Sequence, residues 1–448
     1  MIRRLLPVAC ILPVLLAGTA RADDTLWART FLDGDNSLPS TVRCEGSDVY
    51  VAGSATHDTT MRGFVLKYTD IGFLEWQVTI DFDRFDMVMA LDVGPDGNLV
   101  IGVDAGTGTP VARLCKLGSF GDTLWTRSYS GAAIDKVAVG ADNSIYTVGV
   151  RGPSGLDSVW VAKHTSAGTL VWSRTYLMAA TQLIRGLDVD AQGQPYAAFL
   201  LATAGGDREW SPLVKFSTTG ETLWARTLAG VSNMLGVAVD PGGNALVLTS
   251  GSVRKIRPDG SQAWSAGVSG QLGFDIAVDD QGGSYVGYTD WSQDFKVKKI
   301  SASGQAEWVM RGWHPGQDLP QSVAVDELRR PVLAGISTES SLMQALTIKF
   351  ASVPGVAEPE AGRSPGSPSG CLVTVSRGGM LGWRVARPGD HEYRVLDAAG
   401  RQVGPARRAR LDAGPAALVL PPLSAGAWFI EVRGPGGPAA RGRFVVLD

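Results

Sequence analysis

A short motif that recurs along the chain constrains the fold more than any other feature. A lysine is followed by a glycine five residues later and by a tryptophan four residues after the glycine, as in Lys67, Gly72 and Trp76. Six complete copies are present, and successive tryptophans of the repeat lie 40 to 52 residues apart. A period of this length is typical of proteins built from one repeated supersecondary unit.

A second hairpin is predicted between each of these tryptophans and the next lysine. The segments LDVGPDGNLVIG from Leu91 and VAVDPGGNALVL from Val237 alternate apolar residues, break at a turn rich in Asp, Gly and Asn, and then resume. This pattern predicts two antiparallel strands, and the motif with its own turn predicts two more. Four strands in 40 to 52 residues are typical of one blade of a β-propeller.

The two ends of the repeat predict how the ring closes. Lys349 has no glycine and tryptophan after it, whereas Trp27 has no lysine before it. If the strand of Trp27 completes the unit of Lys349, every unit becomes whole. The sequence therefore predicts an all-β chain with a seven-bladed β-propeller over residues 23–353, closed by its N-terminal strand so that no sheet edge stays open.

The repeated residues are predicted to be structural. A large aromatic side chain at one position per blade is expected to fill the space between twisted sheets. Seven lysines converging on one anion site would repel one another, so we expect each stem to pack on its sheet, with its ammonium in water or near the tryptophan. If the hairpin loop is even in length, Lys67 faces Trp76 directly. The arginine two residues after the tryptophan, as in Arg29, is expected to pair at the surface or between blades. The residues assigned to the structural repeat are Trp27, Trp76, Trp125, Trp172, Trp224, Trp264, Trp308, Lys67, Lys116, Lys163, Lys215, Lys255, Lys299 and Lys349.

The same residues carry a family resemblance. The pattern K-x4-G-x3-W-x-R-T-Y, followed by V-A-V-D-x-x-G-N-x-x-V-x-G, resembles the bacterial SBBP-type β-propeller repeat of secreted and cell-surface proteins. The resemblance covers Asp24 to Phe350. It implies the propeller fold, and it assigns no catalytic residues because the family shares no catalytic set.

The N-terminus predicts export. Residues 1–22 have a basic start, an apolar run and the ending Ala20-Arg21-Ala22, which together are typical of a secretory signal peptide. Its removal changes the formal net charge from −3 to about −6, which argues against a nucleic-acid partner. The remaining Cys44, Cys115 and Cys371 are odd in number and predict no disulfide framework. We expect a monomer that is secreted or displayed on the cell surface via the periplasm.

A second domain is predicted after the propeller. Residues 354–370 contain four prolines and no apolar pattern, which indicates a linker, and residues 371–448 alternate as in a small immunoglobulin-like β-sandwich. The segments YRVLDAAGRQV from Tyr393, LSAGAWFIEVR from Leu423 and the final RFVVLD resemble the C-terminal sorting domain of the type IX secretion system. The resemblance implies outer-membrane secretion machinery as a partner. A generic immunoglobulin-like module is the alternative.

Ligand binding is expected on one face of the propeller. The two tight hairpins of each blade put their turns on one face of the propeller, which we call the tight-turn face. The longer and more variable connections therefore share the opposite face, which we call the long-loop face. Its acids and flat aromatics suit a glycan, and acidic clusters also suit Ca²⁺. The candidate ligand-binding residues are Asp83, Asp86, Asp207, Trp210, Trp291, Asp294 and Trp313.

No catalytic set is assigned. The four histidines share no metal-binding spacing, and no G-x-S-x-G stretch occurs. The prediction is a non-catalytic binding or scaffold protein for an extracellular glycan or protein, without an assigned cofactor, although Ca²⁺ could bind. The alternative is an extracellular carbohydrate-active enzyme, a glycoside hydrolase or lyase, because its acid pair would be set by distance in space.

Overall fold

The chain divides into two compact units, Met1–Ala357 and Glu358–Asp448. The computed structural model describes residues 24–354 of the first unit and 374–446 of the second, apart from short internal segments. Those segments are 107–109, 153–157, 178–179, 204–208, 229–230, 232, 269–271, 290–293, 313, 315–316, 340–341, 376–379, 386–388, 397–400, 412–413, 420–425 and 434–439. The predicted signal peptide, nearly all of the predicted linker, and Cys371 therefore lie outside the described residues.

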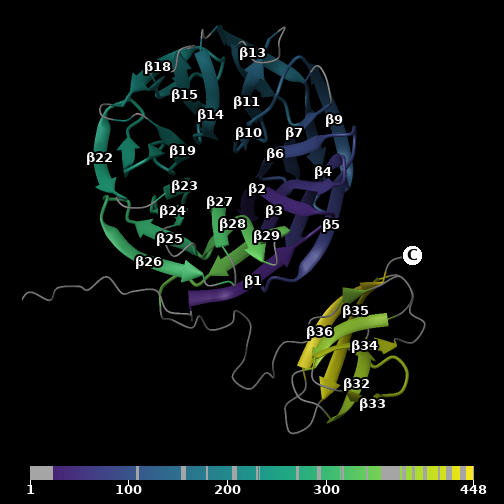
Figure 1. The fold of residues 1–448 in the computed structure, drawn as a ribbon. Coiled ribbons are helices and arrows are strands. Elements are labelled where there is room, and N and C mark those ends of the chain that lie inside the picture. Colours follow the sequence, from purple (N-terminus) through teal and green to yellow (C-terminus); the bar gives the residue numbers. More distant parts are fainter. Residues whose placement is uncertain are drawn as a thin grey trace, which may run out of the picture. The chain divides into compact units, whose positions relative to one another are not determined.

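The first unit is a ring of seven four-stranded antiparallel sheets (Figure 1). Blade 1 contains β2 (Asn36–Glu45), β3 (Asp48–His57), β4 (Thr60–Tyr68) and β5 (Leu74–Ile80). Blade 2 contains β6 (Asp86–Val93), β7 (Leu99–Ala105), β8 (Val111–Leu117) and β9 (Thr123–Ser130). Blade 3 contains β10 (Lys136–Val139), β11 (Ile145–Arg151), β12 (Ser158–His164) and β13 (Leu170–Leu177). Blade 4 contains β14 (Ala180–Val189), β15 (Pro195–Thr203), β17 (Pro212–Phe216) and β18 (Thr222–Thr227). Blade 5 contains β19 (Met234–Val239), β20 (Ala245–Thr249), β21 (Ser252–Ile256) and β22 (Gln262–Gly267). Blade 6 contains β23 (Leu272–Val278), β24 (Ser284–Thr289), β25 (Phe295–Ile300) and β26 (Ala306–Gly312). Blade 7 contains β27 (Gln317–Val325), β28 (Pro331–Glu339), β29 (Leu342–Phe350) and β1 (Thr25–Phe31), and the short β16 (Glu209–Trp210) pairs with β15 in blade 4.

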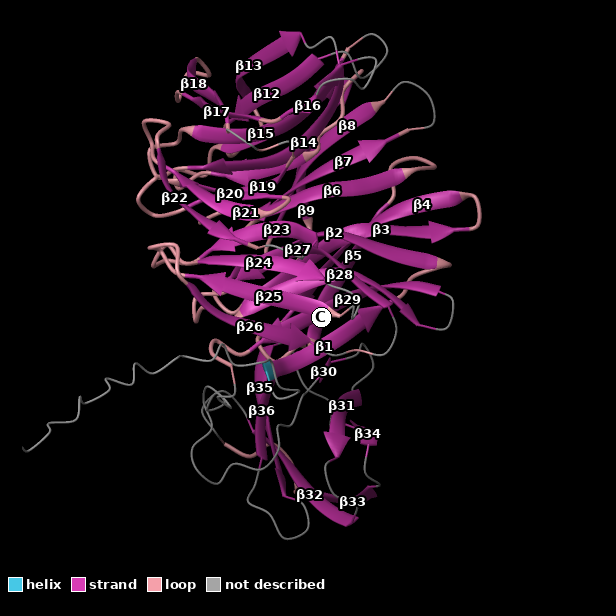
Figure 2. Ribbon diagram, turned by 60° about the vertical axis from the view of Figure 1, so that its left-hand side comes forward, coloured by secondary structure: helices cyan, strands magenta, loops and turns pink. Residues whose placement is uncertain are grey.

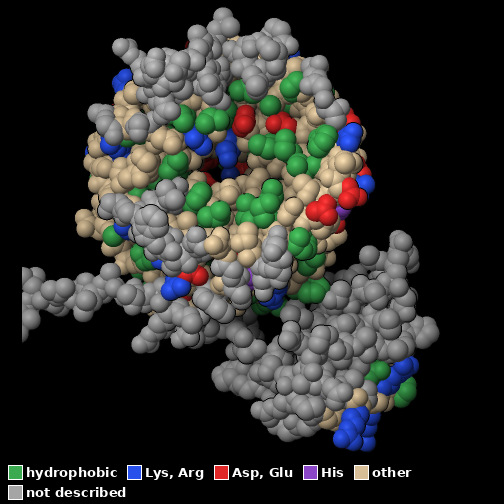
Figure 3. Space-filling model, in the orientation of Figure 1, with side chains coloured by type: hydrophobic (Ala, Val, Ile, Leu, Met, Phe, Trp, Pro, Cys, Tyr) green, Lys and Arg blue, Asp and Glu red, His purple; other side chains and the backbone are tan. Residues whose placement is uncertain are grey.

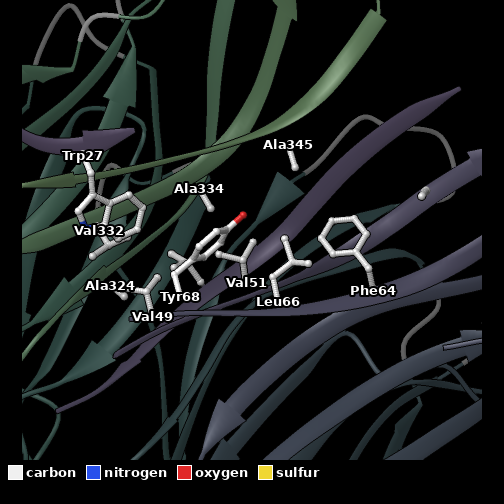
Figure 4. Close-up of a cluster of buried hydrophobic side chains, with 12 residues drawn as sticks. Trp27, Val49, Val51, Phe64, Leu66, Tyr68, Ala324, Val332, Ala334 and Ala345 are labelled. Atoms are coloured by element: carbon white, nitrogen blue, oxygen red, sulfur yellow. The ribbon is translucent and has the colours of Figure 1, made fainter. Parts of the chain in front are cut away.

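The ring closes through the N-terminal strand. β1 runs antiparallel to β29, with Trp27 opposite Lys349, so the first strand of the chain completes the last blade. Buried apolar side chains of blades 7 and 1 pack together at this junction, among them Trp27, Leu66 and Val332 (Figure 4). The predicted seven-bladed propeller with N-terminal closure is confirmed.

The glycine and tryptophan of the motif meet between blades. The Trp172 ring of blade 3 packs on the turn at Gly220 of blade 4, and its Nε1 donates to the Thr218 carbonyl at 2.8 Å. Gly220 has φ of 81°, and a Cβ there would lie 2.7 Å from the Trp172 ring, so only glycine fits without strain. Arg174 donates to the carbonyl of Thr219 in the same turn at 2.9 Å. The motif therefore joins neighbouring blades at this junction, and the same contact from Trp Nε1 to a turn carbonyl recurs at Trp27, Trp76, Trp125, Trp224 and Trp264.

The lysine of the motif faces the tryptophan, and at Lys215 its ammonium is buried. The register places Lys215 directly opposite Trp224, the even-loop arrangement, and the equivalent pairing occurs in all seven blades. Lys215 is 3 % exposed, and its ammonium lies 3.2 Å from the carboxylate of Asp190 and 4.7 Å from the Tyr196 ring centre. For Lys215 the expectation of a solvated ammonium, or one beside the tryptophan, is therefore wrong, because the aspartate of the other hairpin supplies a counter-charge. A fully buried pair joins Lys349 to Asp326, and the buried Lys116 pairs with the exposed Asp96.

The described residues of the second unit form two sheets. One has the order β30 (Thr374–Val375), β31 (Met380–Val385), β34 (Gly414–Val419), and the other has the order β33 (Arg407–Leu411), β32 (Gly389–Leu396), β35 (Gly426–Arg433), β36 (Ala440–Val446). Figure 2 shows that strands account for nearly all the regular structure of both units. An immunoglobulin-like topology for this unit stays a prediction.

Candidate functional site

The long-loop face is the face seen in Figure 3, where apolar side chains surround the channel opening and basic side chains lie within it. The turns between the first and second strands and between the third and fourth strands lie on the opposite face, as at Gly46 and Gly72 of blade 1. The turn after His57 joins the second and third strands and lies on the long-loop face.

The acids predicted to bind ligand on this face serve mostly internal contacts. Asp86 is fully buried, and its Oδ2 accepts the backbone N–H groups of Phe82 and Asp83 at 2.6 and 2.8 Å, so it holds the connection from blade 1 to blade 2 in shape. Asp294 is 4 % exposed and forms an ion pair with Arg311. Asp83 itself is exposed.

The remaining candidates are not placed by side chain. Asp207, Trp291 and Trp313 lie outside the described residues, and for Trp210 only the backbone, paired with β15, is described. Their ligand-binding role stays a prediction.

Large apolar and basic side chains are exposed beside these buried acids. Phe82 and Phe85, on the connection into β6, and Met87, within β6, are 39, 37 and 38 % exposed. We call these three residues the blade 2 patch. The Arg113 guanidinium lies 4.7 Å from the Phe82 ring centre, and that of Arg84 lies 5.7 Å from the Phe85 ring centre. Arginines over phenyl rings with a neighbouring methionine form a surface that is rich in the residue types of protein–protein interfaces.

The channel is lined by the first strand of each blade. A β-bulge interrupts this strand at an equivalent position in six blades, for example between Val88 and Ala90 and between Ile184 and Gly186. Beyond the bulge, equivalent residues of the seven blades form one ring. The ring consists of Arg43, Asp92, Ala138, Asp188, Ala238, Ala277 and Ala324. These residues line a cavity of about 180 Å³, in which the small alanines leave the space.

The channel carboxylates bind backbone groups of neighbouring strands. Asp188 Oδ2 accepts the N–H of Val239 from the next blade at 2.6 Å, and Asp92 Oδ2 accepts the N–H of Val139 at 2.7 Å. Asp92 also lies 3.4 Å from the Arg43 guanidinium. Burial raises the pKa of Asp188 to about 6, although hydrogen bonds from backbone N–H groups oppose this shift. These acids therefore link adjacent inner strands.

A basic residue completes the polar lining of the channel. Burial lowers the pKa of Lys136, an effect that the nearby Asp275 carboxylate opposes and Arg43 reinforces. Asp275 Oδ2 in turn accepts the hydroxyl of Ser322 in the next blade at 2.8 Å. The channel therefore contains both acids and bases, and Asp92, Asp188 and Asp275 each accept a hydrogen bond from a neighbouring blade.

Sequence reasoning missed the channel residues, although a signal was present. Aligned copies of the first strand read V-A-V or I-A-V in four blades, whereas Arg43, Asp92 and Asp188 replace the alanine in the other three. A charge at a position that repeats as alanine marks a special environment. Among the described residues, no group of three or more His, Cys, Asp or Glu side chains is arranged to hold a metal ion. No helix within the described ranges is long and apolar enough to cross a membrane.

Comparisons with known proteins assign neither a family nor a function to the chain. No family model and no curated protein matches the chain. A protein of unknown function from Bacteroides caccae is similar in structure, with 15 % identity, 54 % of this chain and 83 % of that chain covered, and a TM-score of 0.39. Catalytically inactive virginiamycin B lyase from Staphylococcus aureus shows 11 % identity, coverage of 72 and 99 %, and a TM-score of 0.47. Hydrazine synthase of Kuenenia stuttgartiensis shows 13 % identity, coverage of 68 and 95 %, and a TM-score of 0.49.

Proposed function

We propose that the chain is an exported, non-catalytic binding protein whose propeller recognises a protein ligand through the long-loop face. The blade 2 patch carries this proposal. Phe82, Phe85 and Met87 are exposed, whereas the nearby Asp86 is buried and hydrogen-bonded to the backbone of its own loop. A glycan is less well served by this patch, because Arg113 already covers one face of the Phe82 ring on which a sugar would stack.

The patch also suits a protein ligand in its chemistry. Aromatic residues, methionine and arginine are enriched at the cores of protein interfaces, and a flexible methionine adapts to the partner's shape. We further propose that the repeats are of the SBBP type and that the C-terminal unit is a type IX sorting domain that delivers the protein to the cell surface.

Binding is tested with a patch variant and a matched control. The purified mature protein is screened against displayed extracellular protein fragments and a glycan array, and the affinity of each hit is measured by calorimetry. Combined Phe82→Ser, Phe85→Ser and Met87→Ser should weaken protein binding at least about 30-fold, as expected when hot-spot residues are lost. Phe120→Ser removes a phenyl ring that is 82 % exposed on the tight-turn face and should change nothing.

One result would show that the ligand is a glycan and not a protein. If the patch variant binds normally, while replacement of Trp210, Trp291 and Trp313 by Ala abolishes binding to a glycan on the array, the protein-ligand proposal is wrong.

Export is tested separately. Deletion of residues 371–448 should leave a folded propeller in the periplasm of a host with type IX machinery. Equal amounts of full-length and truncated protein at the cell surface would exclude a sorting role.

A further inference from the structure

Charge is divided unevenly between the two units. Residues 358–448 contain 12 arginines, no lysine and eight acids, a formal net charge of +4. Residues 23–357 contain 26 lysines and arginines against 36 acids, a formal net charge of −10. All the lysines of the chain therefore belong to the propeller unit, and the small second unit is basic through arginine alone.

Several of these arginines stand on one face of a sheet. In the sheet β33-β32-β35-β36, β33 is an edge strand, and the register places Arg408 opposite Glu392 and Arg410 opposite Asp390. The alternate residues of β32, Tyr393 and Val395, are 6 and 4 % exposed, so they mark the packed face. Arg408 and Arg410 therefore belong to the solvent-facing side, where the Arg408 side chain is 81 % exposed.

Basic residues outnumber the acids on this face by register. Its acids are Asp390, Glu392 and Glu431, of which Glu431 stands opposite Arg394. Besides Arg394, Arg408, Arg410 and Arg433, β36 adds Arg441, opposite Glu431, and Arg443, opposite Phe429. Glu392 accepts from Arg394 at 2.8 Å and from Arg408 at 3.1 Å, so one carboxylate serves two guanidinium groups. Arg433 is exposed and stands opposite Glu392 on β35. Within the described part of this unit, Arg410 makes no ion pair or hydrogen bond. Basic side chains at the tip of this unit are visible in Figure 3.

We propose that this arginine face, defined by Arg394, Arg408, Arg410 and Arg433, docks on the phosphate headgroups of an anionic lipid membrane. The planar guanidinium forms paired hydrogen bonds with phosphate oxygens, which lysine cannot do. The basic groups are spread over three neighbouring strands of a sheet rather than along one groove. A two-dimensional array matches a planar field of phosphates better than a single linear polymer. Charge on an edge strand also prevents edge-to-edge pairing, but this role requires no surplus of arginine.

The experiment uses the full mature chain and sedimentation with vesicles. Vesicles of equal parts phosphatidylcholine and phosphatidylglycerol should bind the protein, and vesicles of phosphatidylcholine alone should not. Each arginine near an anionic surface contributes about fivefold in partitioning, so Arg408→Gln with Arg410→Gln should weaken binding about 25-fold. Added salt should also release the protein.

Two further variants keep the proposal falsifiable. Glu392→Gln removes an acid from the same face and should strengthen vesicle binding about fivefold, a gain that misfolding could not produce. Arg62→Gln with Arg257→Gln removes the same charge from exposed side chains of the propeller and should leave binding unchanged. Equal binding to neutral vesicles, an equal effect of the propeller variant, or binding of heparin without binding of vesicles would overturn the proposal.

Discussion

Replacement of Asp70 by Asn tests whether a buried charge cluster locks the ring. Asp70 lies in the turn between β4 and β5 of blade 1 and contacts two cations of blade 7, Lys349 at 2.7 Å and Arg330. Asp326 lies 2.9 Å from the same Lys349 ammonium and 2.7 Å from the Arg330 guanidinium. Two acids thus balance two cations where the ends of the propeller chain meet.

The size of the effect follows from burial. Lys349 is fully buried and Arg330 is 4 % exposed, so loss of one carboxylate leaves an uncompensated positive charge inside the protein. Removing one partner of a buried pair costs about 3–5 kcal/mol. Because the Asp70 side chain is 29 % exposed, we expect the lower end, about 3 kcal/mol of unfolding free energy.

Urea unfolding of the mature protein, followed by tryptophan fluorescence, measures this loss. Asp48→Asn is the matched control, because Lys67 loses a carboxylate at 3.0 Å but keeps Glu75 at 2.9 Å, within a single blade. The control should lose less than about 1 kcal/mol. Equal losses in both variants would refute the reasoning that the junction between first and last blades depends on this cluster.

The pH dependence gives a second check on the same cluster. Burial by itself would raise the pKa of Asp70, but the hydrogen bonds and charges of Lys349 and Arg330 outweigh it and hold that pKa below its usual value. A lowered folded pKa means that the stabilisation is fully present above the unfolded pKa and is lost as pH falls through the folded pKa. The stability difference between wild type and Asp70→Asn should therefore be constant near neutral pH and shrink in acid.

Two other substitutions test the contact between Gly220 and Trp172 and the hydrogen bonds by which Asp86 holds its loop. Gly220→Ala should lower the unfolding free energy by about 3 kcal/mol, because it combines a strained positive φ with a clash against the Trp172 ring. Gly97 is the control, since it has φ of 71° with open space around it, and Gly97→Ala should lower the unfolding free energy by only about 1 kcal/mol. Thermal unfolding measures both losses. Asp86→Asn should lower stability by about 1 kcal/mol through weakened loop hydrogen bonds; glycan cleavage abolished by this change at unchanged melting temperature would instead establish the enzyme alternative.

The fold could be predicted because the residues that repeat along the sequence are the ones that contact one another between blades. Gly220 and Trp172 recur at fixed spacing since each interblade contact needs both. The environment of the lysines could not be read as easily. Lys215 meets Asp190, which lies in the other hairpin of the blade, and the prediction considered the lysine only against its tryptophan. The aspartate of the V-A-V-D segments also recurs, so the pairing was present in the sequence.

The site was less predictable, because burial of a loop acid depends on the path of the backbone around it. Asp83 and Asp86 are two residues of one acidic stretch, yet Asp83 is exposed and Asp86 is fully buried. Sequence offers no period here that would separate the two. Exposure of the Phe82 ring likewise follows from the loop being held by Asp86, a contact between residues that do not repeat in other blades.

The placement of the repeat explains how the long-loop face can vary. The Gly220 turn and the Lys215–Asp190 ion pair lie at the tight-turn end of the blade, and Trp172 of the neighbouring blade reaches the same end. The interblade contacts made by the repeat motif are therefore concentrated away from the long loops. A loop on the opposite face can change length or charge without removing these contacts, so the stabilisation from the repeat motif is largely independent of the residues that would bind a ligand.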